Sequence, residues 1–206
     1  MKVLAINGSP HEKGCTFTAI SLLAEELKRQ KIETEIVSIG TKPLQGCIAC
    51  GKCRENGLCI FDDIVNVCIK KMKEADGIII GSPVYYSGIS GQMKSFLDRF
   101  FYAGPDLRFK VGVAVTSLRR SGGVDTFHQL NNFFNLAQVI TVPSFYWNVI
   151  HGSTPDETLQ DLEGVQIMRT LGKNMAWLLK AVSQAKETLP LPEQDTRVFT
   201  NFIRKI

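Results

Sequence analysis

Four cysteines lie within residues 47–59 at the spacing C-x2-C-x2-C-x5-C: Cys47, Cys50, Cys53 and Cys59. Three cysteines at two-residue gaps can wrap a loop around one corner of a cubane iron–sulfur cluster, and a fourth can close the ligand set. Gly51 and Gly57 allow the tight turns that such a loop needs. Zinc sites more often use two separated C-x2-C pairs. The spacing favours a [4Fe-4S] cluster and leaves zinc, free thiols or a disulfide as alternatives.

A second chemical signal is the turn after the first apolar run of the chain. The run breaks into small residues at Gly8 and reaches a helical pattern just after Gly14. Unpaired N–H groups in the first turn of a helix attract anions, and the hydroxyls of Ser9 and Thr16 add donors. We therefore expect a phosphate here, with an ordinary turn capped by Cys15 or Thr16 as the alternative. The turn has neither the Gly-Lys-Ser/Thr of an ATPase loop nor the Gly-x-Gly-x-x-Gly of a dinucleotide site.

The spacing of apolar residues predicts the elements that position these groups. Strands are expected at 3–6, 33–39, 75–83, 110–117 and 137–142. Helices are expected at 17–31, 64–74, 92–102, 124–136 and 159–185, the second of them capped by Asp62 and Asp63. A loop is expected at 83–91 and an irregular stretch at 144–158. The alternation implies an α/β fold, an open parallel sheet with helices on both faces. Since ligands bind beyond the carboxyl ends of such strands, the turns 8–16, 82–91 and 117–123 should form one site.

The composition is that of one soluble globular domain, residues 1–206, with a Cys-rich loop inserted at about 40–61. Of the 206 residues, 44% are hydrophobic and 21% charged, and the net charge is +4 without a basic stripe. This predicts no nucleic-acid partner. A strand follows Met1-Lys2 at once and no apolar run is as long as a membrane span, so we expect neither a signal peptide nor a membrane segment. The predicted location is cytoplasmic, where clustered cysteines favour metal or redox chemistry over disulfides.

Two motifs carry a family resemblance. Gly8-Ser9-Pro10 with Gly14-Cys15-Thr16 resembles the phosphate loop of the NAD(P)H-dependent FMN reductases of flavodoxin-like fold. Residues 81–94, Gly-Ser-Pro-Val-Tyr-Tyr-Ser-Gly-Ile-Ser-Gly-Gln-Met-Lys, followed by Phe-Leu-Asp-Arg at 96–99, resemble that family's second flavin loop. The resemblance implies a doubly wound five-stranded parallel sheet of order 2-1-3-4-5.

The resemblance also implies site residues, with no catalytic side chain, because the flavin carries the bond chemistry. The FMN phosphate would lie against Ser9, His11, Cys15, Thr16 and Phe17. The ribityl chain and ring would lie against Pro83, Val84, Tyr85, Tyr86, Ser87 and Gly88. The pyrimidine side would border Ser117, Arg119, Gly122 and Gly123. His11 and Cys15 replace the family's usual Arg and Asn, which puts the phosphate contacts there in doubt.

The cysteine spacing resembles that of the iron–sulfur flavoproteins, a branch of the same family. The function expected from this resemblance is an FMN-dependent NAD(P)H oxidoreductase, passing electrons between flavin and a [4Fe-4S] cluster to a small-molecule or redox-protein acceptor. Two alternatives stay open: a non-catalytic carrier of flavodoxin type, and a flavin-free zinc-binding interaction domain. The slightly basic charge disfavours the first, since flavodoxins are usually acidic.

Four further expectations concern single residues and assembly. Cys68 should be a core residue, His128 and His151 structural, and Asp98 and Arg99 an ion pair on one helix. Aromatic residues at 100–102, 133–134 and 145–147 exceed what the helices near them need. Such clusters favour interfaces, so we expect a homodimer or homotetramer.

Overall fold

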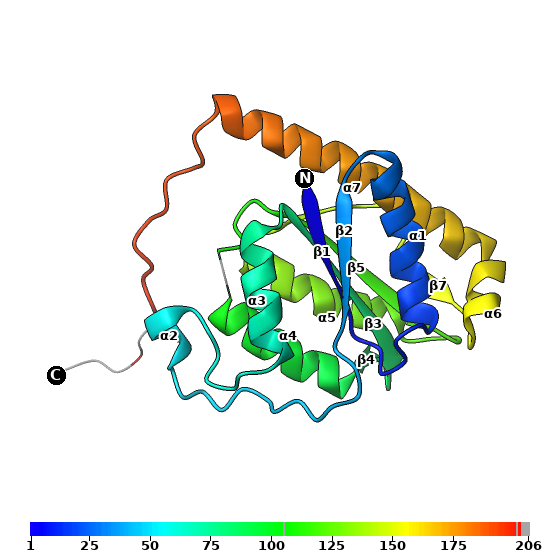
Figure 1. Cartoon of the computed structure of the whole chain (residues 1–206), viewed down its shortest axis with the longest axis horizontal. Helices are drawn as coiled ribbons and strands as arrows, with labels where there is room; N and C mark the ends of the chain where they lie inside the picture. The colour runs from blue at the N-terminus through cyan, green and yellow to red at the C-terminus, as the bar shows by residue number, and fades with distance from the viewer. Residues whose placement is uncertain (105, 201, 203–206) are drawn as a thin grey trace.

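The computed structural model describes residues 1–104, 106–200 and 202 and has three layers (Figure 1). One sheet is covered on one face by α1 and α7 and on the other by α3, α4 and α5. The strands are β1 Lys2–Asn7, β2 Glu33–Ser38, β3 Gly77–Tyr85, β4 Gly88–Ile89, β5 Val111–Leu118, β6 Ile140–Thr141 and β7 Val149–His151. The helices are α1 Cys15–Arg29, α2 Cys53–Asn56, α3 Ile64–Glu74, α4 Gly91–Ala103, α5 Gly123–Leu136, α6 Pro155–Gln160 and α7 Leu162–Thr188.

The main sheet has the predicted order, β2-β1-β3-β5-β6, and its strands are parallel. The register pairs Asn7 with Gly81 and Pro83 with Ser117, so the carboxyl ends of β1, β3 and β5 meet at one edge. The sheet has seven strands rather than the five predicted. Short β4 pairs antiparallel with the end of β3, and β7 pairs parallel with the end of β5.

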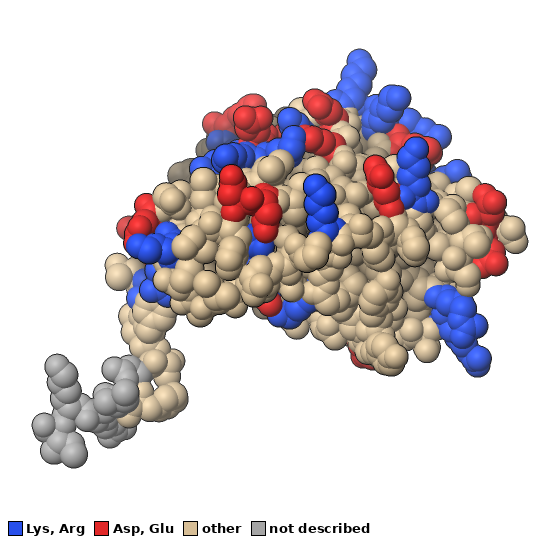
Figure 2. Space-filling model, turned by 60° about the horizontal axis from the view of Figure 1, so that its bottom comes forward, with Lys and Arg blue, Asp and Glu red and all other residues tan. Residues whose placement is uncertain are grey.

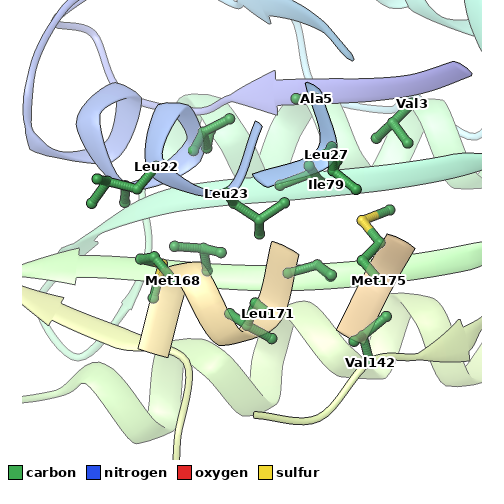
Figure 3. Close-up of a cluster of buried hydrophobic side chains, with 14 of the residues drawn as sticks. Val3, Ala5, Leu22, Leu23, Leu27, Ile79, Val142, Met168, Leu171 and Met175 are labelled. Atoms are coloured by element: carbon green, nitrogen blue, oxygen red, sulfur yellow. The ribbon is translucent and has the colours of Figure 1, made fainter. Parts of the chain in front are cut away.

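Alternation along the strands divides the core in two. Val3 and Ala5 of β1 face α1 and α7, whereas Leu4 and Ile6 face α3, α4 and α5. Figure 3 shows the first cluster, where leucines of α1 meet Met168, Leu171 and Met175 of α7 above Ile79 of β3. Because both faces are buried, the central strands are continuous apolar runs.

The last third of the sheet differs from the sequence expectation. The strand predicted over 137–142 shortens to Ile140–Thr141, which pairs with the start of β5. The stretch 144–158, predicted as irregular, contains β7 and the start of α6, and α6 is separated from α7 by Asp161. The reason is that β6 and β7 share one neighbour, each using a different half of β5.

The surface mixes both signs of charge, and Figure 2 shows acidic and basic side chains interspersed on the face it presents. Among residues 1–104, 106–200 and 202, no helix is apolar over a length that could cross a bilayer. After α7 the chain leaves the body and returns toward α2, where Arg197 and Phe199 border Arg54 (Figure 1).

Candidate flavin and sulfur site

The turn after β1 is built to hold the start of α1 against the sheet edge. The Gly8 N–H donates to the Gly81 carbonyl at 2.8 Å, and a Cβ on Gly8 would lie 2.7 Å from the Met93 side chain. Ser9 is buried, and its hydroxyl accepts the His11 N–H at 3.1 Å. Only a glycine allows this close approach at position 8, so the turn is held tightly at its base.

The amino end of α1 has no side-chain cap within the described residues. Gly14 is the N-cap residue. The alternative of a cap by Cys15 or Thr16 is therefore wrong. The Cys15 thiol points to the Gly152 carbonyl at 3.5 Å, and the buried Thr16 hydroxyl lies 2.7 Å from that of Ser117. Uncapped N–H groups at the positive end of the helix dipole favour a bound anion.

The other two residues expected at the phosphate, His11 and Phe17, differ in exposure. His11 is exposed on the turn, and Phe17 is half-buried in the first turn of α1. His11 also accepts the Gly14 N–H through its carbonyl at 3.2 Å, which closes the turn. Both residues therefore lie near the amino end of α1.

The second turn is a β-hairpin, not the loop predicted over 83–91. The end of β3 pairs with β4, so that Tyr85 lies opposite Gly88. The two residues at its tip, Tyr86 and Ser87, both have positive φ, 49° and 57°. Pro83 and Val84 are half-buried at its base, and Tyr85 is exposed. Tyr86 is fully exposed at the tip of the hairpin.

The third turn packs on the hairpin. Ser117 is buried at the end of β5, and Arg119 is exposed after it. Gly122 has φ of 85°, and a Cβ there would lie 2.7 Å from the Ser87 hydroxyl. Gly123 then begins α5 packed against Val149. The three turns thus lie side by side, as the sheet order requires.

A pocket of about 250 Å³ opens beside this third turn, between the starts of α5 and α7 and the end of β7. Tyr146, Trp147, His151 and Glu163 line it together with Gly122 and Gly123. Tyr146, Trp147, His151 and Glu163 are not among the site residues expected from the sequence. The adjacent aromatic residues were the sequence signal for this pocket: the Tyr146 and Trp147 rings pack edge to face beside it, with their centroids 4.6 Å apart.

The four clustered cysteines line a second pocket, with Phe61, Arg99 and Tyr102. Cys47 and Cys50 are exposed, and Cys53 and Cys59 are half-buried. The loop curls at Ala49, Gly51 and Gly57, which all have positive φ. Across the described ranges, no three His, Cys, Asp or Glu side chains are arranged to hold a single metal ion. The four thiols therefore line one pocket, on a loop that bends back on itself.

The thiols of this loop are close enough to affect one another's ionisation. Burial raises the pKa of Cys53, and the thiols of Cys59, Cys47 and Cys50 raise it further, against a lowering by a backbone hydrogen bond. Cys68 is different, because it is fully buried among apolar side chains of α3, and burial raises its pKa to about 12. It is a core residue, as predicted.

One expectation for charged residues was wrong. Arg99 pairs not with Asp98 but with Asp63, 36 residues away, while Asp98 pairs with Lys94 one turn back on α4. His151, expected to be structural, has Nδ1 3.2 Å from Asp161, and its ring also lines the first pocket. For both Arg99 and His151 the partner lies outside the residue's own element, which local spacing does not reveal.

Comparisons with known proteins agree with this geometry. Residues 1–154 match the model of the NADPH-dependent FMN reductase family. An iron–sulfur flavoprotein of Methanocaldococcus jannaschii is 39% identical over 193 residues, covering 89% of this chain and 100% of the relative. An iron–sulfur flavoprotein of Methanosarcina thermophila is 28% identical over 192 residues, covering 91% of this chain and 100% of the relative.

Solved structures show the same fold at low identity. A flavone reductase has a TM-score of 0.69 at 18% identity, covering 90% of this chain and 65% of that chain. An archaeal flavodoxin has a TM-score of 0.60 at 14% identity, covering 87% of this chain and 99% of that chain. A rubredoxin oxygen oxidoreductase of Desulfovibrio gigas has a TM-score of 0.62 at 17% identity, and this chain spans 37% of it. The chain therefore has a flavodoxin-like fold and belongs to the NADPH-dependent FMN reductase family of flavin oxidoreductases.

Proposed function

We propose that this protein is an FMN-dependent NAD(P)H oxidoreductase of the iron–sulfur flavoprotein type. The observation that carries the proposal is the convergence of three turns on an uncapped helix start, on a chain that also gathers four thiols around one pocket. When bound, FMN would accept hydride from NAD(P)H and the cluster would accept single electrons, so both chemistries belong to the cofactors.

The turn after β1 would bind the phosphate. The free N–H groups at the start of α1 point out of the helix, and the dipole favours negative charge there. The side chains of Cys15 and Thr16 are turned toward Gly152 and Ser117, so their backbone N–H groups would make the contacts. This arrangement explains how the chain could tolerate Cys where the family usually has Asn.

The hairpin and the third turn would hold the ring. Tyr85 and Tyr86 offer aromatic surface, which suits stacking on a flat ring. Gly122 and Gly123 let the backbone come close, and the N–H groups at the start of α5 could donate to ring carbonyl oxygens. Within the part of the chain the structure describes, α5 has no side-chain cap, which leaves those donors available. The neighbouring pocket between β7 and α7 is where we would place the nicotinamide or the electron acceptor.

The spacing of the four cysteines favours a cluster over zinc. A single zinc ion draws four sulfurs to about 2.3 Å from one centre. A four-iron cluster holds its thiolates on four separate irons and so spaces them more widely. This chain has one compact C-x2-C-x2-C-x5-C run rather than two separated C-x2-C pairs, and all four of its thiols line one pocket. Both observations support Cys47, Cys50, Cys53 and Cys59 as cluster ligands.

The test is an absorption spectrum of protein purified without oxygen, with iron and acid-labile sulfide assayed on the same sample. We expect flavin bands, a broad cluster shoulder and about four irons per chain. Cys50→Ser should lose iron, whereas Cys68→Ala, a thiol outside the pocket, should keep it. Anaerobic NADH or NADPH should bleach the flavin band.

Each component of the proposal can fail separately. Flavin without iron would remove the cluster and leave an FMN reductase. Flavin that no reduced nicotinamide bleaches would favour the flavodoxin-type carrier. Zinc in a colourless protein that does not take up added FMN would contradict the whole proposal.

A further inference from the structure

Arg99 is the largest fully buried side chain of the described residues, with 1% of its surface exposed. All of its hydrogen bonds go to the base of the cysteine loop. Nη1 donates to Asp63 at 2.7 Å and to the Gln45 carbonyl at 3.1 Å. Nη2 donates to Asp63 at 2.9 Å and to the Phe61 carbonyl at 3.1 Å. Nε donates to the Cys59 sulfur at 3.1 Å.

This guanidinium ties both ends of the loop to one point of the fold. Gln45 precedes the four cysteines and Phe61 follows them, and both carbonyls accept from the same side chain. Asp63 is the N-cap of α3, with its carboxylate also accepting the Val65 N–H at 3.0 Å. Only a planar fork with donors in several directions can make this set of contacts, so a lysine could not replace it.

The contact with sulfur makes the four thiols unequal. Cys59 receives a charge-assisted hydrogen bond from a buried cation, whereas Cys47 and Cys50 are exposed. Hydrogen bonds to cluster sulfurs and nearby positive charge stabilise the reduced, more negative state. The bidentate pair with Asp63 offsets part of the Arg99 charge, so the two residues would act on the potential with opposite signs.

We propose that Arg99 is a positioning residue of the sulfur centre: it holds residues 45–61 ready for the cluster and raises the reduction potential through Cys59. The inference rests on the proposed iron–sulfur function and extends it to a residue that is no ligand. A purely structural arginine would also be buried and paired, but its replacement would change the amount of loaded protein and not the potential of the loaded fraction.

The first experiment uses the full chain without cluster. Lys52 and Arg54 are exposed tryptic sites inside the loop. In Arg99→Lys the loop loses its shared anchor, and we expect at least tenfold faster cleavage at these two sites. Lys94→Gln is the matched control, since Lys94 is on the same helix but pairs with exposed Asp98. It should be cleaved at the wild-type rate, and equal rates in Arg99→Lys would overturn the anchoring role.

The second experiment measures the midpoint potential of the reconstituted cluster. Arg99→Lys should shift it to a more negative value, because the N–H···S bond is lost while the charge remains. Asp63→Asn should shift it to a more positive value, because the offsetting carboxylate becomes neutral. Shifts of the same sign, or lower iron content with an unchanged potential, would contradict the proposal.

The two experiments also separate this inference from the proposed function. If Arg99→Lys fails to fold, the shift of the midpoint potential in Asp63→Asn decides alone. An unchanged or more negative potential in that variant would contradict the proposal. If the wild-type protein binds no iron, the cluster fails as a function, and the cleavage comparison still decides whether Arg99 holds the loop.

Discussion

Asp161 joins two parts of the candidate site through its carboxylate. One oxygen accepts the Gly164 N–H at 3.0 Å and caps α7. The other accepts the His151 N–H at 2.7 Å and lies 3.2 Å from the His151 ring. Burial alone would raise the pKa of Asp161, but these donors outweigh it and lower the pKa below its ordinary 3.8.

A lowered pKa predicts how stability depends on acid. The ionised carboxylate stabilises the folded state fully above pH 3.8, and the gain is lost as pH falls through the lower folded value. Asp161→Asn keeps a good cap but removes the charge. It should lower the free energy of unfolding by up to about 1 kcal/mol at pH 6, and the difference should shrink from pH 4 to 2. Urea unfolding at a series of pH values measures this.

Thr154→Ala provides a neutral comparison. The Thr154 hydroxyl caps the neighbouring α6 by accepting the Glu157 N–H at 3.2 Å, and a hydroxyl does not titrate in this range. Its loss should cost about 1 kcal/mol at every pH tested. If Asp161→Asn behaved in the same pH-independent way, the lowered pKa of Asp161 would be wrong.

At the scale of elements, the hairpin between β3 and β4 is strained at its tip. A two-residue hairpin turn with positive φ at both positions is normally filled by Asn and Gly. Here Tyr86 and Ser87 occupy it, and each non-glycine residue in this region costs on the order of 1 kcal/mol. The hairpin is held in place by Gln129, which accepts the Ile89 N–H at 3.2 Å. Strain retained beside a ligand edge points to a use for the exposed Tyr86 ring.

Replacing the two strained residues should therefore change stability and FMN binding in opposite directions. Tyr86→Asn combined with Ser87→Gly should raise the free energy of unfolding by about 1 kcal/mol, while FMN affinity falls at least tenfold because the ring is lost. Thermal unfolding of flavin-free protein and fluorescence titration with FMN measure the two effects. Unchanged affinity would remove Tyr86 from the flavin site.

Lys31→Gly tests whether relieved strain alone changes binding. Lys31 also has a positive φ, 61°, but it lies in the turn between α1 and β2, at the opposite edge of the sheet. The substitution should stabilise the protein in the same way and leave FMN affinity unchanged. A fall in affinity here would mean that flexibility, not the Tyr86 ring, controls binding.

The same elements show what the sequence could predict. Strand β3 was readable because a strand buried on both faces is a continuous apolar run. The α3 start was readable because Asp63 is a capping residue next to an amphipathic run. Strands β4 and β7 are two and three residues long, and they form only because the ends of β3 and β5 offer free edges. No local pattern signals such strands.

Polar contacts between residues far apart in the chain could not be predicted from the sequence either. The three turns could be assigned to one edge because topology alone dictates it. The Arg99 contacts could not, since they depend on how the cysteine loop folds back onto α4. Adjacent Asp98 looked like the natural partner, but residues i and i+1 point in different directions on a helix.

At the scale of the whole molecule, part of the expected aromatic surplus is core. Phe100 and Phe134 are fully buried, and Phe101 packs against both Phe100 and Phe133. The stretch 145–147 is different, since Phe145, Tyr146 and Trp147 are 54%, 56% and 44% exposed. Three adjacent exposed aromatic side chains beside a ligand pocket are typical of an interface, so self-association stays our prediction.

The prediction is that this aromatic stretch forms the contact between copies. Light scattering at micromolar concentration should give at least twice the 22.9 kDa of one chain. Tyr146→Ser with Trp147→Ser should lower the mass toward one chain, because an interface loses most of its binding energy with its aromatic anchors. Leu136→Ser is the control, because Leu136 is 78% exposed at the far end of α5. Since Tyr146 and Trp147 also line the pocket, the same double substitution should slow the proposed NAD(P)H oxidation as well as lower the mass. A wild-type protein with the mass of one chain would contradict the interface.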